Sequence, residues 1–208
     1  MSELTEWVLA AGTVVGGLGT AGGLVYAARQ IQAAREEQRT SERWKRTEFA
    51  RALIDRLSTD EELAFCTRAL DWGVGPLIIP ARYRPLFPVG TATFEHNVVL
   101  MAAALKADLD VVWRQPEALT YRYCFDSFFA YLDAIRYHVA VGNVDLSQLV
   151  GLQYYLDLVR VPRYSAKEED NTFGPFLDRY FPGLKKFIWT TLPAEGKGRR
   201  GQCTGSAA

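Results

Sequence analysis

The sequence is poor in the residues that build metal and redox centres. It has two histidines and three cysteines among 208 residues, and Cys66, Cys124 and Cys203 show no CxxC spacing. An odd, unpatterned set of cysteines does not predict a disulfide framework, and two histidines offer little for a metal site. No P-loop, G-x-S-x-G, HExxH or cysteine/histidine zinc pattern is present. We therefore expect no bound metal and no cofactor.

An excess of charge of either sign is also missing. Lysine plus arginine and aspartate plus glutamate number 24 each, so no overall field attracts nucleic acid, which we regard as an unlikely partner. Basic residues are nevertheless concentrated directly after an apolar run. The stretch 29–46 contains six basic residues and three acidic ones. The basic residues are Arg29, Arg35, Arg39, Arg43, Lys45 and Arg46, and the acidic ones are Glu36, Glu37 and Glu42.

The apolar run from Trp7 to Ala28 is the most distinctive segment. Its 22 residues carry no charge, and as a helix they would span about 33 Å, enough to cross a hydrocarbon core of about 30 Å. Trp7 and Tyr26 lie near its ends, where aromatic rings prefer the headgroup level. We expect a transmembrane helix over 7–28, with the lipid bilayer as its partner.

Two alternatives compete with the transmembrane helix. A cleaved signal peptide would need a basic start and a shorter apolar stretch, whereas the chain begins MSELTE. A buried soluble helix would have to tolerate six glycines, which is costly in water. The positive-inside rule places residues 1–6 outside and everything after Arg29 in the cytoplasm, so we expect a single-pass protein of the inner membrane.

The glycines of this segment form two G-x-x-x-G pairs, Gly12 with Gly16 and Gly19 with Gly23. Such pairs let two helices approach closely in lipid, and they predict a homo-oligomer through this face. Glycine is also common in transmembrane helices generally, which is the plainer interpretation.

Residues 29–48 predict a basic juxtamembrane stalk, because Arg29 to about Leu57 is free of glycine and proline and rich in helix formers. The stalk lacks sustained apolar heptads, so a coiled coil is not expected. It is either a solvated helix or a surface for anionic headgroups, with Arg29, Arg35 and Arg39 as the contact residues.

Residues 49–192 predict a cytosolic domain of about six helices, and the fold class is therefore all-α. A capping box at Ser58/Glu61 or Thr59/Glu62 starts a helix that ends at Gly73. Four prolines in 73–90 indicate a long loop with a short extended piece near Leu77–Ile79. Further helices are expected over Thr93 to about Val112, from Pro116 to near Gly142, from about Asp145 to Pro162, and over Phe173–Leu192 with a break at Pro182. Residues 193–208 lack core residues and predict a disordered tail.

Asp126 and Asp133 are the first candidates for chemistry, because residues seven apart lie on nearly the same helix face. With His138 or Glu95, they would form the catalytic set of an enzyme. The competing interpretation is a solvated face with an Arg122–Asp126 pair and structural histidines, His96 included. No E-x-x-H accompanies the carboxylates, as a di-iron bundle would require.

The order of parts resembles a group of uncharacterised single-pass bacterial membrane proteins with a helical cytosolic domain, some of them described as phage abortive-infection proteins. The resemblance rests on EFARALIDRL, on DEEL followed by ALDW, and on FDSFFAYLDAIRYHVAVGNVD followed by LQYYLDLV. It implies a role in stress sensing or defence and transfers no catalytic residue.

Two functions remain open. The first is a non-enzymatic interaction or sensor module that binds an unknown protein through the 73–90 loop and the tyrosine-rich helices. The second is a membrane-tethered hydrolase or nuclease-like effector, which requires Asp126, Asp133 and His138 to converge in one cavity.

Overall fold

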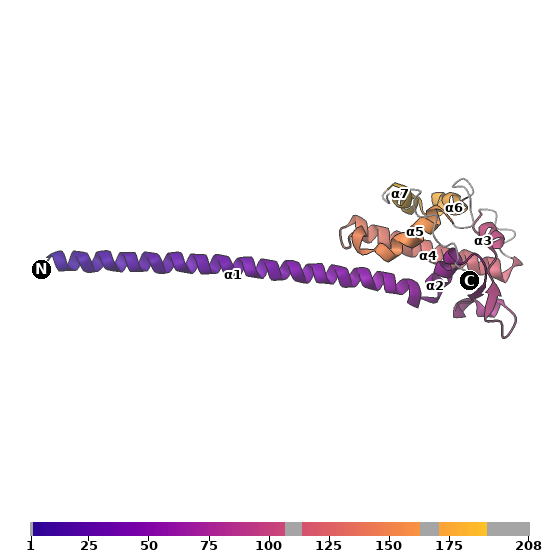
Figure 1. Cartoon of the computed structure of the whole chain (residues 1–208), viewed down its shortest axis with the longest axis horizontal. Helices are drawn as coiled ribbons and strands as arrows, with labels where there is room; N and C mark the ends of the chain where they lie inside the picture. Colours follow the sequence, from indigo (N-terminus) through magenta and orange to yellow (C-terminus); the bar gives the residue numbers. More distant parts are fainter. Residues whose placement is uncertain (1, 107–113, 163–170, 191–208) are drawn as a thin grey trace, which may run out of the picture. The chain divides into compact units, whose positions relative to one another are not determined.

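A computed structural model describes residues 2–106, 114–162 and 171–190, apart from the side chains of 2–25 and 28. The chain is mostly helical in this part, with one small sheet (Figure 1). It divides into two compact units, Met1–Glu48 and Phe49–Ala208. The element order in the second unit confirms a helical bundle.

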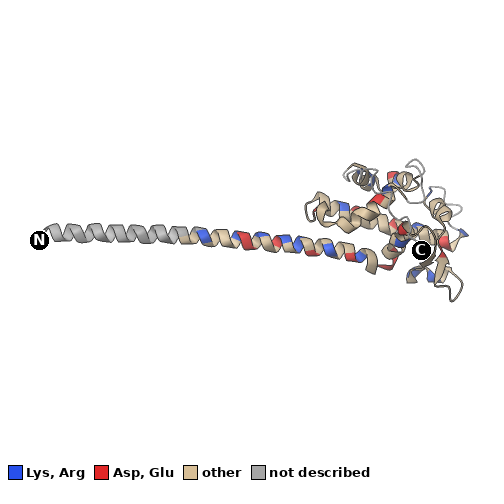
Figure 2. Ribbon diagram, in the orientation of Figure 1, with Lys and Arg blue, Asp and Glu red and all other residues tan. Residues whose placement is uncertain are grey.

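Helix α1 runs without a break from Ser2 to Thr59. No proline occurs in it, and no glycine follows Gly23, so nothing in the sequence interrupts its second half. The residues from Arg29 to Phe49 are all exposed, and Lys and Arg are interspersed with Asp and Glu along this part (Figure 2). The helix expected from Arg29 to about Leu57 is therefore confirmed as part of a longer one.

Within the part of the chain that the structure describes, no helix combines the length and the apolar character that a membrane crossing requires. The span expected at Trp7–Ala28 falls almost wholly among residues whose side chains lie outside that part, as do the glycines at 12, 16, 19 and 23. The tail expected over 193–208 also lies outside the described residues.

Helix α2, Glu61–Asp71, begins at a cap that the sequence analysis placed wrongly. Asp60 is the N-cap, and its carboxylate accepts from the backbone N–H groups of Glu62 and Leu63. Ser58 and Thr59 instead donate their hydroxyls to the Asp55 carbonyl at the end of α1. A carboxylate one residue later can reach two orphan N–H groups, which is why it replaces the capping box.

The end of α2 also differs from the expectation of a glycine cap at Gly73. The helix ends at Asp71, and Trp72 already has extended backbone angles, with φ −100° and ψ 124°. The chain needs no left-handed residue here because it leaves the helix directly in an extended conformation. Gly75, at φ 126°, makes the turn into the following strand.

The proline-rich segment is ordered and contains one strand and one 3-10 helix. Strand β1, Pro76–Ile78, pairs antiparallel with β2, Thr93–Glu95, in the register Leu77 opposite Phe94. Between them lies η1, Ala81–Leu86, which includes Pro85. The short extended piece expected near Leu77–Ile79 is thus present, one residue earlier.

The helix expected over Thr93 to about Val112 is wrong over its first turn, and it ends earlier than expected, at Ala104. Residues 93–95 form β2, and α3, Val98–Ala104, begins only after Asn97, whose side chain accepts from the N–H of Leu100. Phe94, Val98 and Met101 have helical spacing, but pairing with β1 holds residues 93–95 in an extended conformation. This is a tertiary effect, which a local sequence pattern does not indicate.

Helix α4, Pro116–Ala140, is the centre of the helical domain, and its bounds confirm the expectation from Pro116 to near Gly142. It packs against α2, α3 and α7. The fully buried rings of Phe125, Phe128 and Phe129 on its core face contact one another, and Phe125 and Phe129 also contact Phe173. The buried ring of Tyr121 contacts Phe65 and Phe94 instead. Gly142, at φ 76°, ends the helix.

The remaining helices follow the expected order; α7 packs on α4, whereas α5 packs on α2, α6 and α7. The 3-10 helix η3, Leu146–Gln148, is capped by Asp145 and leads into α5, Val150–Arg160. Helices α6, Phe173–Tyr180, and α7, Pro182–Thr190, are separated at Phe181, which confirms the break at Pro182. The segment 163–170 between α5 and α6 lies outside the described residues.

Candidate functional site

A surface pocket lies between η1 and α4, with a volume of about 450 Å³. We call it the η1–α4 pocket. The proline-rich segment and the tyrosine-rich helix contribute its walls: Arg82, Tyr83, Pro85 and Leu86 from η1, and Tyr123, Asp126 and Ser127 from α4. It brings together two segments that the sequence analysis named separately as contact surfaces.

The η1 wall is held in place by α2. Glu62 accepts hydrogen bonds from the hydroxyl of Tyr83 at 2.9 Å and from Arg82 at 3.5 Å, and Glu61 accepts from the N–H of Ala81 at 2.6 Å. Burial, aided by the bond to Glu62, raises the pKa of the Tyr83 hydroxyl, so the tyrosine stays neutral. The ring of Tyr83 stacks on that of Tyr123, with 5.9 Å between centroids and 8° between planes.

The α4 wall contains an ion pair rather than a free carboxylate. Nε of Arg122 donates to Asp126 Oδ2 at 3.0 Å. The Arg122 guanidinium is buried and lies 4.7 and 4.8 Å from the ring centroids of Phe176 and Tyr180. Its Nη1 has no hydrogen-bond partner among the described residues. Asp126 is therefore the main counter-charge of the buried Arg122 guanidinium.

The other carboxylates proposed as catalytic do not line this pocket. Asp133 is held by Arg136, with Nε to Oδ1 at 2.6 Å, and this bond raises the pKa of the Arg136 guanidinium. Seven residues of helix separate Asp126 from Asp133 by about 10 Å along the axis. Glu95 is exposed on β2.

His138 lies near the end of α4, away from both aspartates. Its ring meets the edge of Phe49 at 5.0 Å between centroids, and its Nδ1 is 3.3 Å from the side-chain nitrogen of Asn143. Among the residues that the structure describes, the pocket is lined by one of the three candidates, Asp126, and not by Asp133 or His138.

His96 forms a buried polar pair with Tyr121. Nδ1 of His96 is 2.6 Å from the Tyr121 hydroxyl, which also accepts from the N–H of Asn97 at 3.0 Å. Burial lowers the pKa of His96, and the backbone of Ala69 opposes this in part. Tyr121 can donate its proton to Nδ1 of a neutral imidazole, whereas Nε2 is buried and has no hydrogen-bond partner among the residues that the structure describes. The position of the pair fastens β2 and α3 to α4.

The two described cysteines are buried thiols. Cys66 and Cys124 are fully buried, on α2 and α4, and burial raises the pKa of each. Neither has the exposure or the lowered pKa that a reactive cysteine requires. Within the described ranges, no group of three His, Cys, Asp or Glu side chains is placed to hold a metal ion.

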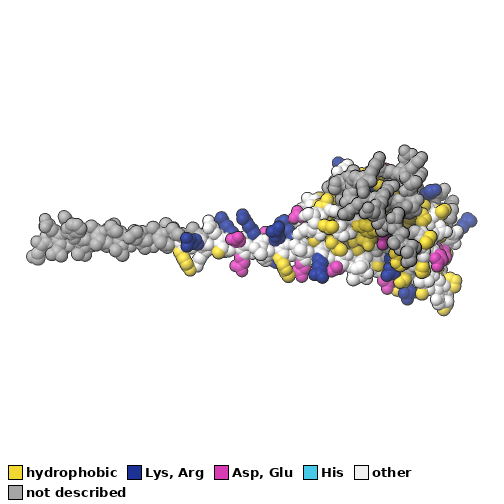
Figure 3. Space-filling view, in the orientation of Figure 1, with side chains coloured by type: hydrophobic (Ala, Val, Ile, Leu, Met, Phe, Trp, Pro, Cys, Tyr) yellow, Lys and Arg dark blue, Asp and Glu magenta, His cyan; other side chains and the backbone are white. Residues whose placement is uncertain are grey.

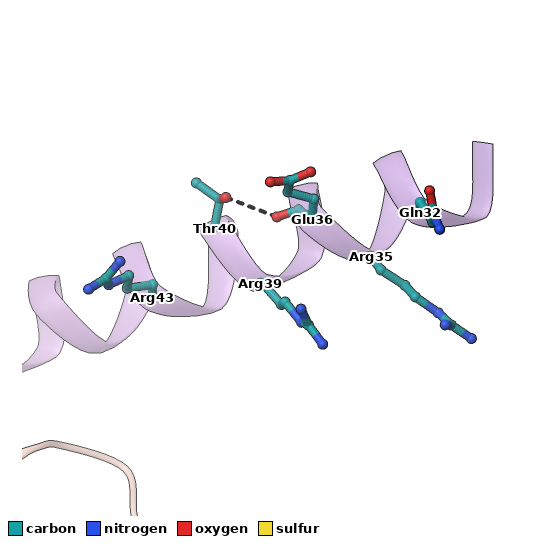
Figure 4. Close-up of a pocket in the computed structure, with 6 residues that line it drawn as sticks. All are labelled: Gln32, Arg35, Glu36, Arg39, Thr40 and Arg43. Atoms are coloured by element: carbon teal, nitrogen blue, oxygen red, sulfur yellow. Dashed lines mark hydrogen bonds between the residues drawn. The ribbon is translucent and has the colours of Figure 1, made fainter. Parts of the chain in front are cut away.

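The arginines of the stalk lie along one exposed stretch of α1. Gln32, Arg35, Glu36, Arg39, Thr40 and Arg43 border a shallow space beside the helix (Figure 4). A single exposed helix has no concave wall, so we interpret this as an open surface rather than a cavity. Dark-blue basic side chains line the described part of the helix, with magenta acidic side chains and isolated hydrophobic ones between them (Figure 3).

Sequence reasoning identified Asp126 and the two segments but missed the individual pocket residues Arg82 and Ser127. The link from η1 to Glu62 spans 20 residues and has no local pattern. The run Arg82-Tyr83-Arg84 inside a proline-rich segment was the available signal, since ordered prolines and a tyrosine commonly mark a contact surface.

No protein-family model, no curated protein and no solved structure matches the chain.

Proposed function

We propose that the chain is a membrane-anchored helical module that binds a protein partner in the η1–α4 pocket. One observation carries this proposal: the pocket's two charged side chains are both engaged within the chain. Arg82 pairs with Glu62, and Asp126 pairs with Arg122. What the pocket offers a ligand is then the apolar and aromatic surface of Pro85, Leu86 and Tyr123, which suits recognition better than acid–base catalysis.

Support for the membrane anchor comes from the sequence. The uncharged run 7–28 is long enough to cross a bilayer, and the basic residues that follow it favour a cytoplasmic C-terminal domain in the inner membrane. The glycine pairs at 12/16 and 19/23 support self-association through this segment. A role in bacterial stress or phage defence rests on the resemblance alone.

A tethered enzyme is the second candidate, and it has less support. It needs several acid–base groups in one cavity, whereas the η1–α4 pocket holds one candidate carboxylate, and that carboxylate neutralises Arg122.

Site-specific photocrosslinking tests the partner site. A photoreactive phenylalanine analogue replaces Tyr123, which is 39% exposed in the pocket, or Tyr137, which is 58% exposed toward the other end of the same helix. In bacterial cells, we expect a discrete crosslinked protein from position 123 and none from 137. Equal crosslinking from both positions, or none from either, would overturn the proposed site.

Membrane fractionation tests the anchor. The full chain is expected to remain in the membrane pellet after a wash at high salt and high pH, because an apolar span is not released by either. A chain that lacks residues 1–28 is expected in the supernatant. Release of the full chain by salt alone would contradict a transmembrane helix.

A further inference from the structure

Three arginines of the stalk form a compact basic patch. Arg39, Arg43 and Arg46 are separated by four and three residues, so they share one helix face over two turns. We call them the arginine patch. All three are exposed, and within the described residues none of them forms an ion pair. In the close-up of this stretch, which includes Arg39 and Arg43, the one interaction drawn joins Thr40 to the Glu36 carbonyl (Figure 4).

The stalk's own carboxylates neutralise the patch only in part. By the helix period, Glu36 and Glu42 border it on either side, while Glu37 and Glu48 fall on the opposite side of α1. Like charges three or four residues apart repel and cost a helix a few tenths of a kcal/mol per pair. Three arginines therefore lie along one face with two glutamates at its edges, which leaves the face with a net positive charge.

The anchor puts the arginine patch beyond the reach of lipid headgroups, an argument that rests on the proposed transmembrane segment. At about 1.5 Å per residue, Arg39, Arg43 and Arg46 lie about 16, 22 and 27 Å past Ala28 along the axis. The headgroup layer is about 5–7 Å thick on each side. Arg29 thus lies within the headgroup layer, whereas the arginine patch lies beyond it.

The helix period also places the patch opposite the glycine pairs. Positions 12, 16, 19 and 23 fall on the face of α1 that carries Glu37 and Glu48 further along. Self-association through the glycines would leave the arginine patch facing outward, so a second copy of the chain does not cover it.

We propose that the arginine patch binds an acidic helix of a partner protein. An exposed helix has no cavity for a small ligand, so its occupant is elongated and lies along it. Arginine pairs in bidentate geometry with carboxylates, and acidic side chains at positions i, i+4 and i+7 of a second helix repeat the spacing of the patch. A nucleic-acid duplex, with phosphates on both strands, would meet Glu36 and Glu42 at the edges.

A direct binding measurement tests this proposal. The full chain is reconstituted in phosphatidylcholine nanodiscs, so that no anionic lipid competes. The probe is a fluorescent helical peptide with glutamates at i, i+4 and i+7, and its control has the same composition with glutamates scattered around the helix. We expect the first peptide to bind and the second to bind at least about tenfold more weakly.

Two variants locate the binding surface. Arg39→Gln/Arg43→Gln/Arg46→Gln is expected to weaken binding of the glutamate-row peptide about tenfold, because three exposed ion pairs are lost. Arg29→Gln/Lys45→Gln removes two charges from positions that the helix period places off the face of the patch, and is expected to change binding little. Circular dichroism confirms that the helix content of each variant is retained.

Three outcomes would overturn the proposal: equal binding of both peptides, no effect of the triple variant, or tighter binding of a DNA duplex or phosphatidylserine vesicles at this patch. A chain that does not enter nanodiscs would refute the anchor instead. Peptide binding would then still be measured on the chain in solution, so the two failures are distinguishable.

Discussion

Arg122 brings a positive charge into the interior of the helical domain, where an unpaired charge is costly. Its guanidinium lies over Phe176 and Tyr180, and Asp126 supplies its ion pair. Asp133 and Arg136 form an otherwise similar pair nearer the surface, where both side chains are about one-third exposed. The two aspartates proposed from their shared helix face thus have different structural roles.

Asp126→Asn is expected to lower the free energy of unfolding by about 1–3 kcal/mol, because it leaves a buried guanidinium without its counter-charge. Asp133→Asn, the matched control, is expected to cost less than about 1 kcal/mol because its pair is screened by water. Urea unfolding followed by circular dichroism measures both. Equal losses would contradict the assigned difference in burial.

His96 makes stability depend on pH, and the direction follows from its lowered pKa. The unfolded imidazole has a pKa of about 6.5, so below that pH the unfolded chain binds a proton before the folded chain does. Stability is therefore intact above about pH 6.5 and falls as the pH decreases toward the lower folded pKa.

We predict that this slope disappears in His96→Gln and persists in His138→Gln, the other of the chain's two histidines. Thermal midpoints between about pH 7.5 and 5.5 provide the measurement. An unchanged slope in His96→Gln would assign the effect to other groups.

At the scale of elements, the N-cap of α2 distinguishes two hypotheses that the local sequence leaves open: a cap at Asp60 and a capping box at Ser58 or Thr59. Asp60→Ala is expected to cost about 1 kcal/mol, since two backbone N–H groups lose their acceptor. Ser58→Ala and Thr59→Ala are expected to cost only a few tenths, because these hydroxyls bond to the end of α1. Chemical denaturation ranks the three, and a larger loss at Ser58 would restore the capping box.

Helix boundaries were predictable where one residue decides them locally. Pro116 and Gly142 bound α4 because proline suits a first turn and glycine adopts positive φ. Strand β2 was not predictable, because Thr93–Glu95 becomes extended only through pairing with Pro76–Ile78. The central pair, Leu77 and Phe94, is 17 residues apart in the sequence. The helical spacing of apolar residues around Phe94 does not indicate that pairing.

At the scale of the whole molecule, the chain consists of an exposed helix and a unit with its own core. We predict that a fragment of residues 49–192 folds by itself and unfolds cooperatively, because the buried aromatic rings around α4 all belong to it. Differential scanning calorimetry checks this. Non-cooperative melting of the fragment would mean that residues before Phe49 contribute to the fold.

The candidate site was predictable at this scale only in part. Spacing on α4 identified Asp126, and the prolines of 73–90 identified an ordered segment, but not that the two form one pocket. The pocket depends on Glu62 of α2, which accepts hydrogen bonds from Tyr83 and Arg82, about 20 residues later in the sequence. Spacing also could not tell a carboxylate bound to a buried arginine from one free for chemistry.

The contact between Phe49 and His138 provides a built-in spectroscopic reporter. The histidine ring meets the phenylalanine edge-on at 5.0 Å, and the only other histidine lies 5.8 Å from Tyr121 in the core. In a proton NMR spectrum each imidazole is shifted by the ring current of its neighbour, so the two signals are separate. The His138 signal then reports whether the last turns of α1 are docked on α4, without any label on the protein.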